Sequence, residues 1–284
     1  MGERLTEWKR RGRAAQERVE AARTEHRSVE FGFGFIRHDA QIGGGLLAGA
    51  LAYRLFVFLL PASLLLVSGL GLYAGAVDKS RAEVASEAGL HGLIASEVAS
   101  TASGRHRAVV FLVMLPAVAY AAITLYRAIA RVHAIVWLGS GQGVKTTRRG
   151  LAVFAATLAL QFVVVEIVGW LRRSSQFSGL LALLLYLVVV GGAWLAVSLD
   201  LPHRDVRWTR LLPGALLVGA GLLLINVFNV YVTTRLVENR ANTYGALGIA
   251  TALLFSLVLV GRLIVSSAEL NAALCEPEPR EPLD

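Results

Sequence analysis

The stretch from residue 43 to residue 76 is apolar throughout except for one charged residue, Arg54. It is longer than the roughly 20 residues that an α-helix needs to cross a bilayer. A guanidinium near the middle of a membrane costs roughly 2.5 to 3.5 kcal/mol on insertion scales, so Arg54 needs a polar partner or a ligand. The stretch therefore predicts a membrane-spanning helix in a protein that keeps polar groups within the bilayer.

The composition of the whole chain agrees with a membrane protein. Of its 284 residues, 55% are hydrophobic and 17% are charged, and the mean hydropathy is +0.59. A soluble domain would have to bury most of this apolar surface, whereas lipid solvates it directly. The single cysteine, Cys275, excludes a disulfide within one chain.

Apolar windows of about 20 residues, ended by polar breaks, predict an all-α bundle of six transmembrane helices. The predicted spans are residues 43–76, 108–130, 150–171, 179–199, 213–235 and 244–270. Pro61 in the first span and Pro116 in the second each remove a backbone hydrogen bond, which predicts bends there. The chain then divides into a basic helical N-terminal segment (1–41), a membrane domain (42–275) and a flexible tail (276–284).

Basic residues are distributed unequally between the two faces that six spans define. Eighteen of the 28 Lys and Arg residues fall on the face that carries the N-terminus, and eight fall on the opposite face. Because cytoplasmic segments carry the excess of Lys and Arg, both termini are predicted to lie in the cytoplasm. This distribution explains the net charge of +8 without nucleic-acid binding. Residues 78–104 predict an amphipathic helix on the outer interface, either packed on the bundle or acting as a lid.

Polar residues near the middle of the spans form a first group of candidates. At about 1.5 Å of rise per residue, Arg54 and Asn226 lie at similar depths near the bilayer midplane. Arg54 is therefore expected to pair with Asn226 or Gln161, or to bind an anionic ligand.

A second group lies closer to the membrane surfaces. Glu269 is expected to form a structural ion pair with Arg127 or Arg131, which are four residues apart and share a helical face. Arg262 shares a face with Glu269, two turns away. Glu166 lies nearer the external surface, where the arginines that follow its span are its expected partners.

Glycines spaced at helical intervals predict where helices approach closely. Gly45 and Gly49 form such a pair in the first span, and the fifth span carries Gly214, Gly219 and Gly221. Small residues let two backbones pack together in a membrane, where no hydrophobic force drives helices into contact.

Three sequence patterns that could indicate an enzyme lack residues or spacing that the activity requires. Residues 139–146 read GSGQGVKT, which is close to a phosphate-binding loop, but Val144 replaces a required glycine and a membrane helix precedes it. His203, Arg204 and Asp205 match only a fragment of a kinase catalytic loop. The six histidines are scattered singly and have no metal-ligand spacing. We therefore expect no enzyme, no cofactor and no metal.

Two segments carry a resemblance to a known family. Ala48 begins the segment AGALAYRLFVFLLPASLLLVSGLGL, and Asn242 begins the segment NTYGALGIATALLFSLVLVGRLIVSSAELNAAL. These resemble the first and last helices of the YihY/BrkB family, and the resemblance extends from about residue 30 to about residue 275. The residues that carry it are Tyr53, Pro61, Tyr244, Gly245, Glu269 and Asn271.

The resemblance implies a bacterial inner-membrane protein of the cell envelope with about six helices. Members are sometimes labelled ribonuclease BN, but that activity requires a cluster of the type His-x-His-x-Asp-His, which this sequence lacks. We therefore reject the nuclease label. Arg54, directly after Tyr53, departs from the small or aromatic residue expected in the family.

Two classes of function remain open. The first is a transporter or flippase-like protein for an amphiphilic anionic lipid or envelope precursor, with a small-anion channel as a variant. The second is a membrane scaffold or envelope assembly factor that transports nothing. Membrane lipids are the expected partners, nucleic acid is not, and a homo-oligomer is left open. The substrate-binding candidates are Arg54, Tyr53, Gln161, Asn226 and Asn229. The candidate polar network comprises Arg127, Arg131, Glu166, Arg262, Glu269 and Asn271.

Overall fold

The computed structural model describes residues 27–76, 104–174, 177–228 and 234–275, and this part of the chain is helical without a strand. Its elements, in order, are α2 (Arg27–Ile42), α3 (Gly44–Ala76), α6 (Gly104–Leu138), α7 (Arg148–Ser174), α8 (Phe177–Asp200), the 3-10 helix η1 (Trp208–Leu211), α9 (Leu212–Phe228) and α10 (Thr234–Cys275). The predicted all-α class is confirmed. The predicted amphipathic helix at 78–104 and the tail at 276–284 fall outside the described residues, apart from residue 104.

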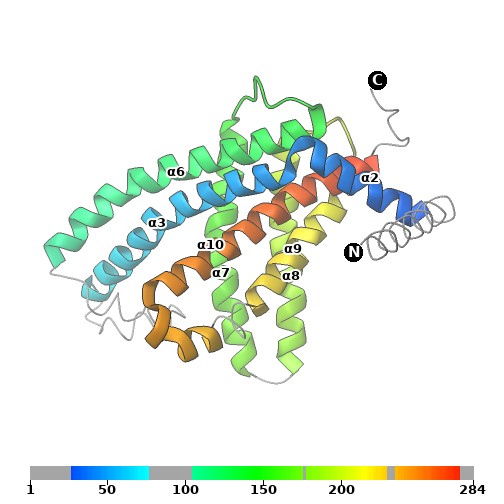
Figure 1. The fold of residues 1–284 in the computed structure, drawn as a ribbon. Helices are drawn as coiled ribbons and strands as arrows, with labels where there is room; N and C mark the ends of the chain where they lie inside the picture. Colours follow the sequence, from blue (N-terminus) through cyan, green and yellow to red (C-terminus); the bar gives the residue numbers. More distant parts are fainter. Residues whose placement is uncertain (1–26, 77–103, 175–176, 229–233, 276–284) are drawn as a thin grey trace, which may run out of the picture.

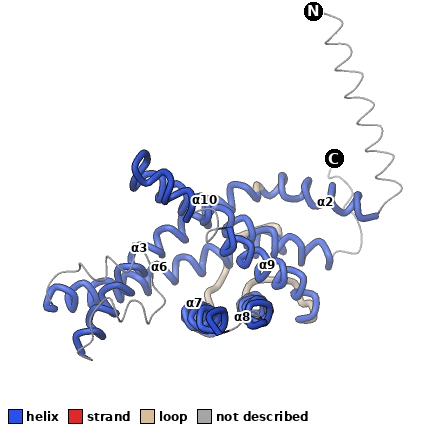
Figure 2. Tube along the Cα trace, turned by 90° about the horizontal axis from the view of Figure 1, so that it is seen from below, coloured by secondary structure: helices blue, strands red, loops and turns tan. Residues whose placement is uncertain are grey.

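The long helices form two groups joined through α9. Helix α3 packs along α6 and α10, α7 packs on α8, and α9 contacts both α8 and α10. In Figure 1, α3, α6 and α10 run side by side, while α7 and α8 descend from the same region. Figure 2 shows α7 and α8 nearly end-on while α3 and α6 cross the view. The two groups are therefore inclined to each other.

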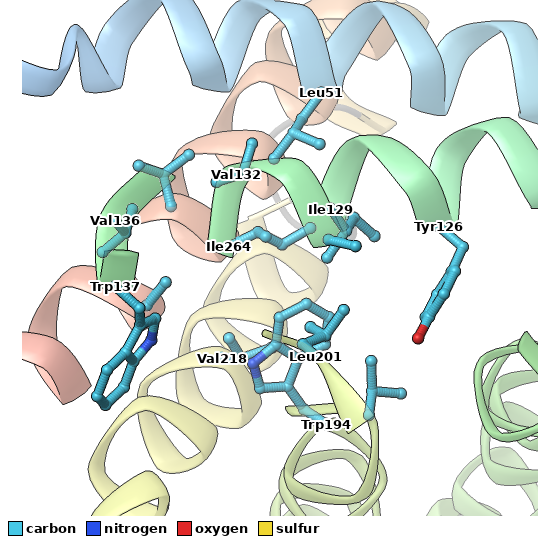
Figure 3. Packing of buried hydrophobic residues seen from close by; sticks show 14 of the residues in the cluster. Leu51, Tyr126, Ile129, Val132, Val136, Trp137, Trp194, Leu201, Val218 and Ile264 are labelled. Carbon is cyan, nitrogen blue, oxygen red and sulfur yellow. The ribbon is translucent and has the colours of Figure 1, made fainter. Parts of the chain in front are cut away.

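One end of the bundle collects the starts of α3, α7 and α9 and the ends of α6, α8 and α10. We call it the packed end. Its core includes Leu51 from α3, Ile129 from α6, Trp194 from α8, Val218 from α9 and Ile264 from α10, which converge in Figure 3. Side chains from five helices thus fix the relative positions of the elements at this end.

Five of the described helices contain segments long and apolar enough to cross a membrane. These segments are Gly44–Ala74, Ala108–Leu138, Leu183–Asp200, Trp208–Asn226 and Leu253–Cys275. Their outward surfaces carry large apolar side chains such as Leu112, Tyr120, Val188 and Leu224. Such a surface suits lipid better than water. The predicted third span coincides with α7, a helix of 27 residues, but not all of its side chains are described, so the count of six stays a prediction.

The second predicted span was too short. It was expected to end near residue 130, yet α6 continues to Leu138. Arg127 and Arg131 point outward, while Val132, Val136 and Trp137 of the same turns are buried. A charge on the exposed face of a helix does not end it when the opposite face still packs on the core.

Close helix contacts form at some of the predicted glycines and not at others. A Cβ on Gly214 would collide with the Nδ2 of Asn271, and one on Gly219 would lie 3.1 Å from the carbonyl oxygen of Leu187. Gly261, which the sequence did not single out, faces the carbonyl oxygen of Ala48 so closely that a Cβ would collide with it. Gly45 and Gly49, in contrast, are exposed and have nothing within 4 Å of a Cβ position. The expectation of close packing at that pair was wrong for contacts within the described chain.

Short connections close the packed end. Gly43, with φ of 67°, separates α2 from α3, and its N–H donates to the carbonyl oxygen of Ala40 at 3.3 Å. The segment 139–147, which includes the GSGQGVKT pattern, connects α6 to α7 and uses positive φ at Gly139 and Gly143. Thr147 then caps α7, because its Oγ1 accepts a hydrogen bond from the N–H of Gly150 at 3.0 Å.

Candidate functional site

An ion pair joins α2 to α10 at the packed end. The Nη1 of Arg262 donates a hydrogen bond to the Oδ1 of Asp39 across 2.6 Å. The Asp39 side chain is 19% exposed and that of Arg262 is 38% exposed. Gly44 makes room for this pair, because a Cβ there would collide with Asp39 and lie 2.9 Å from the Nη1 of Arg262. Gly44, the first residue of α3, therefore has a structural role beside the ion pair.

The guanidinium of Arg262 holds the pKa of Asp39 below its ordinary value of 3.8. The hydrogen bond from Arg262 is the largest cause, and the partial burial of Asp39 opposes it. Asp39 is consequently ionised at neutral pH, which gives α2 a negative charge to present to α10.

Glu269 lies beside this pair and is far more buried. Glu269 is only 1% exposed, and no hydrogen-bond donor among the described residues reaches either oxygen of its carboxyl group. The carboxyl groups of Asp39 and Glu269 lie near enough to act on each other's charge. A hydrogen bond between two carboxyl groups forms only when one of them carries a proton. Asp39, Arg262 and Glu269 together are called the carboxyl cluster below.

The partners predicted for Glu269 were wrong. Arg127 and Arg131 have exposed side chains on α6, and neither donates to Glu269. The observed neighbours are Arg262, on its own helix, and Asp39, which the sequence did not single out. Asp39 lies 223 positions from Arg262 in the chain. The only signal for it was an acidic residue just before the first span, at the same expected depth as Arg262 and Glu269.

Asn271 lies two positions after Glu269 on α10 and holds the backbone of a neighbouring element. Its Oδ1 accepts a hydrogen bond from the N–H of Gly214 at 2.7 Å, and its Nδ2 donates to the carbonyl oxygen of Leu211 at 3.2 Å. These groups belong to the junction between η1 and α9. Asn271 is 3% exposed, so both bonds form away from solvent.

Arg54 does not enter the interior of the described bundle. Its side chain is exposed on α3, as is that of Tyr53, which is 62% exposed. Within the part of the chain that the structure describes, no hydrogen bond or ion pair involves Arg54. At about 1.5 Å of rise per residue, it lies roughly 15 Å along α3 from Gly44. Its guanidinium therefore lies at membrane depth on an outward face.

The other predicted polar residues are spread over the molecule. Gln161 is half-buried on α7, and Asn226 is exposed on α9. Neither contacts Arg54 within the part of the chain that the structure describes, so this group is not brought together there. Asn229 and the side chain of Glu166 lie outside the described part. Among the described residues, no group of three or more His, Cys, Asp or Glu side chains has metal-site spacing.

Comparison with known proteins gives a family. Residues 37–283 match the family described as Virulence factor BrkB, which is most of the chain and includes α3 and all later helices. No curated protein matches the chain, and no solved structure matches it. The match includes the carboxyl cluster, Asn271 and Arg54. The chain is thus a multi-helix membrane protein that belongs to the BrkB virulence factor family.

Proposed function

We propose that this protein binds an anionic amphiphilic lipid at the α3 surface around Arg54 and helps the lipid head group cross the bacterial inner membrane. The role is binding and movement, with no chemical conversion of the lipid, no cofactor and no metal. Both termini lie in the cytoplasm in this proposal, as the distribution of Lys and Arg favours.

The exposed Arg54 carries the proposal. A guanidinium at this depth lacks water, and no described residue satisfies it. A phosphate or carboxylate head group would provide both a compensating charge and bidentate acceptors for its N–H groups. The apolar face of α3 next to it, with Leu46, Leu60 and Leu64 exposed, suits the acyl chains of the same molecule.

Tyr53 and Arg54 place two different polar side chains on adjacent faces of α3. Tyr53 presents an aromatic ring and a hydroxyl to the outside of the described bundle. Its hydroxyl can donate to a head-group oxygen while the ring remains in lipid. The pair therefore forms a recognition point on a path that a head group follows along the outside of α3.

Lipid retention and lipid movement test the proposal directly. Native mass spectrometry of the protein in nanodiscs identifies the lipids that it retains. In proteoliposomes, the fraction of a fluorescent lipid that dithionite can reach reports movement of that lipid across the bilayer. We expect Arg54→Met to lose a retained anionic lipid and to slow its movement, and Arg54→Lys to keep part of both. Arg127→Met is the matched control, because Arg127 is also exposed but lies on α6. Equal lipid retention and equal movement in wild type and Arg54→Met, both folded, would contradict the proposal.

A scaffold role is a second candidate, favoured by the exposed glycines of α3. Gly45, Gly49 and Tyr53 follow one another at four-residue intervals on one outward face, and a side chain at either glycine would meet nothing. Such a surface lets another membrane helix approach closely, and a second copy of this chain is the partner we propose. Gly49→Leu should then shift the oligomer to monomer in mass photometry. An unchanged mass distribution would remove this candidate.

A further inference from the structure

The carboxyl cluster holds more acidic groups than its one cation can neutralise. Asp39 and Glu269 bring two carboxyl groups to Arg262. With both carboxyl groups ionised, the cluster would carry a net negative charge, and the buried one would have no hydrogen-bond donor. An unpaired charge in such a place strongly destabilises the fold, even in a relaxed protein interior. The cluster therefore needs one more positive charge.

A bound proton supplies both the missing positive charge and the missing hydrogen-bond donor. Glu269 and Asp39 face each other, and a proton on one supplies the donor that neither carboxylate has. A larger cation would have to enter beside the guanidinium of Arg262, which already contacts Asp39 at 2.6 Å. We propose that Glu269 and Asp39 form a proton-binding site, in which protonated Glu269 donates a hydrogen bond to the carboxylate of Asp39 and so holds α2 against α10.

The position of the proton follows from the surroundings of each group. Asp39 already accepts a hydrogen bond from Arg262 and is partly exposed, so it keeps the charge. Glu269 is buried, so it keeps the proton. The cluster is then neutral, with one carboxylate, one guanidinium and one carboxylic acid. Release of the proton breaks the O–H bond of Glu269, and the proton passes to water through the exposed edge of Asp39.

Other ionisable groups around the cluster do not replace this proton. On α2, His38 directly precedes Asp39 and favours the ionised form of the Asp39 carboxyl group. Residues 44–52 of α3 contain no ionisable side chain. Arg131 of α6 and Arg210 of η1 are exposed, and neither reaches the oxygens of Glu269.

Loss of the proton should weaken the contact between α2 and α10. Two carboxylates would then face each other, and one would remain buried without a donor. Among the described elements, α2 packs mainly on α3 and α10, so the cluster lies at one of its two main contacts. The arrangement in which α2 contacts α10 binds the proton more tightly than an arrangement in which the two helices have separated. The contact between them must therefore weaken as pH rises.

Infrared spectroscopy tests the proton itself. In nanodiscs at neutral pH, wild type should show a carbonyl stretch of a protonated carboxyl group, and Glu269→Gln should lose it. Asp39→Asn should retain the band at a shifted frequency, because the acceptor changes. Asp205→Asn is the matched control, since Asp205 is exposed and its removal should leave the band unchanged. Absence of the band in wild type, or its persistence in Glu269→Gln, would overturn the site.

Hydrogen exchange tests the effect on α2. Protection factors, corrected for the intrinsic pH dependence of exchange, should fall several-fold in α2 as pH rises in wild type. Glu269→Gln keeps a donor at the same place without a titratable group, so its α2 should stay protected at high pH. Equal pH dependence in wild type and Glu269→Gln would overturn the role of the proton in holding α2. This outcome is independent of lipid binding at Arg54, so the two proposals fail separately.

Discussion

The side chain of Asn271 forms hydrogen bonds with Gly214 and Leu211, which lie on either side of the junction between η1 and α9. Its Oδ1 accepts from the N–H of Gly214 at 2.7 Å, and its Nδ2 donates to the carbonyl oxygen of Leu211 at 3.2 Å. The first N–H groups of a helix have no intrahelical acceptor, and Gly214 is the third residue of α9. A side chain from α10 thus supplies the cap that α9 does not have in its own sequence, and it ties the two helices together.

Replacement of Asn271 should be costly because two buried backbone groups would lose their partners. We expect Asn271→Leu to lower the free energy of unfolding by about 2 to 6 kcal/mol, at about 1 to 3 kcal/mol for each of the two unsatisfied groups. Asn271→Asp keeps the size and the acceptor but loses the donor and adds a charge, so it should be no more stable than the leucine variant. Unfolding in mixed micelles of increasing SDS content measures both. Asn226→Leu, on an exposed site of α9, should stay within about 0.5 kcal/mol of wild type.

Gly261 and Gly49 offer a matched comparison of two glycines in spanning helices. A Cβ on Gly261 would collide with the carbonyl oxygen of Ala48, a backbone atom that cannot move aside alone. Gly261→Ala should therefore destabilise the protein by about 1 to 3 kcal/mol. Gly49→Ala meets nothing and improves helix propensity, so it should be neutral or slightly stabilising. The same unfolding assay measures both. Equal effects of the two substitutions would show that α3 and α10 do not approach as described.

The spans could be predicted because the bilayer imposes a length and a solvent on each helix. Helices α3 and α8 begin and end within two residues of the predicted limits. Prediction failed where the two faces of one helix differ. The second span was expected to end near residue 130, whereas α6 continues past the exposed Arg131, with Val132 and Trp137 buried beyond it. A sum over a window cannot separate an exposed charge from a buried apolar side chain one position away.

The site was harder to predict because it depends on the rotation of each helix. Depth along the membrane correctly grouped Arg262 with Glu269, but it could not show that Arg131 points outward or that Asp39 points inward. The same limit applies to Gly45 and Gly49, whose spacing suits a helix contact while their face lies outside the described bundle. Spacing indicates which residues share a face, and only tertiary packing determines what that face meets.

Thr147 should contribute a measurable part of the stability of α7. Its Oγ1 accepts from the N–H of Gly150 at 3.0 Å, and its hydroxyl also interacts with that of Tyr126 on α6. Thr147→Val preserves the shape and removes both interactions, so we expect a loss of about 1 kcal/mol, toward 2 if the Tyr126 contact adds to the cap. Thr146→Val changes the neighbouring residue, whereas the cap comes from Thr147, so it should have little effect. Equal unfolding midpoints for the two variants would contradict the capping role.

The ion pair between Asp39 and Arg262 should make stability depend on pH in the acid range. Arg262 lowers the pKa of Asp39 below 3.8, so the folded state holds the carboxylate more strongly than the unfolded state does. The resulting stabilisation is complete above the unfolded pKa and is lost as pH falls through the folded pKa. Because both side chains are partly exposed, at 19% and 38%, solvent screening limits it to about 1 kcal/mol.

Unfolding of wild type and Asp39→Asn, measured from neutral pH down into the acid range, tests this sign. Wild type should be the more stable protein at pH 5 to 7 by about 1 kcal/mol, and the difference should shrink as pH falls well below 3.8. Raised salt should reduce the difference at neutral pH, since the pair is partly accessible to ions. Asp205→Asn, which removes an exposed carboxyl group away from this ion pair, should follow wild type throughout. A stability difference that persists undiminished into strong acid would mean that Asp39 stabilises the fold through its shape and not through its charge.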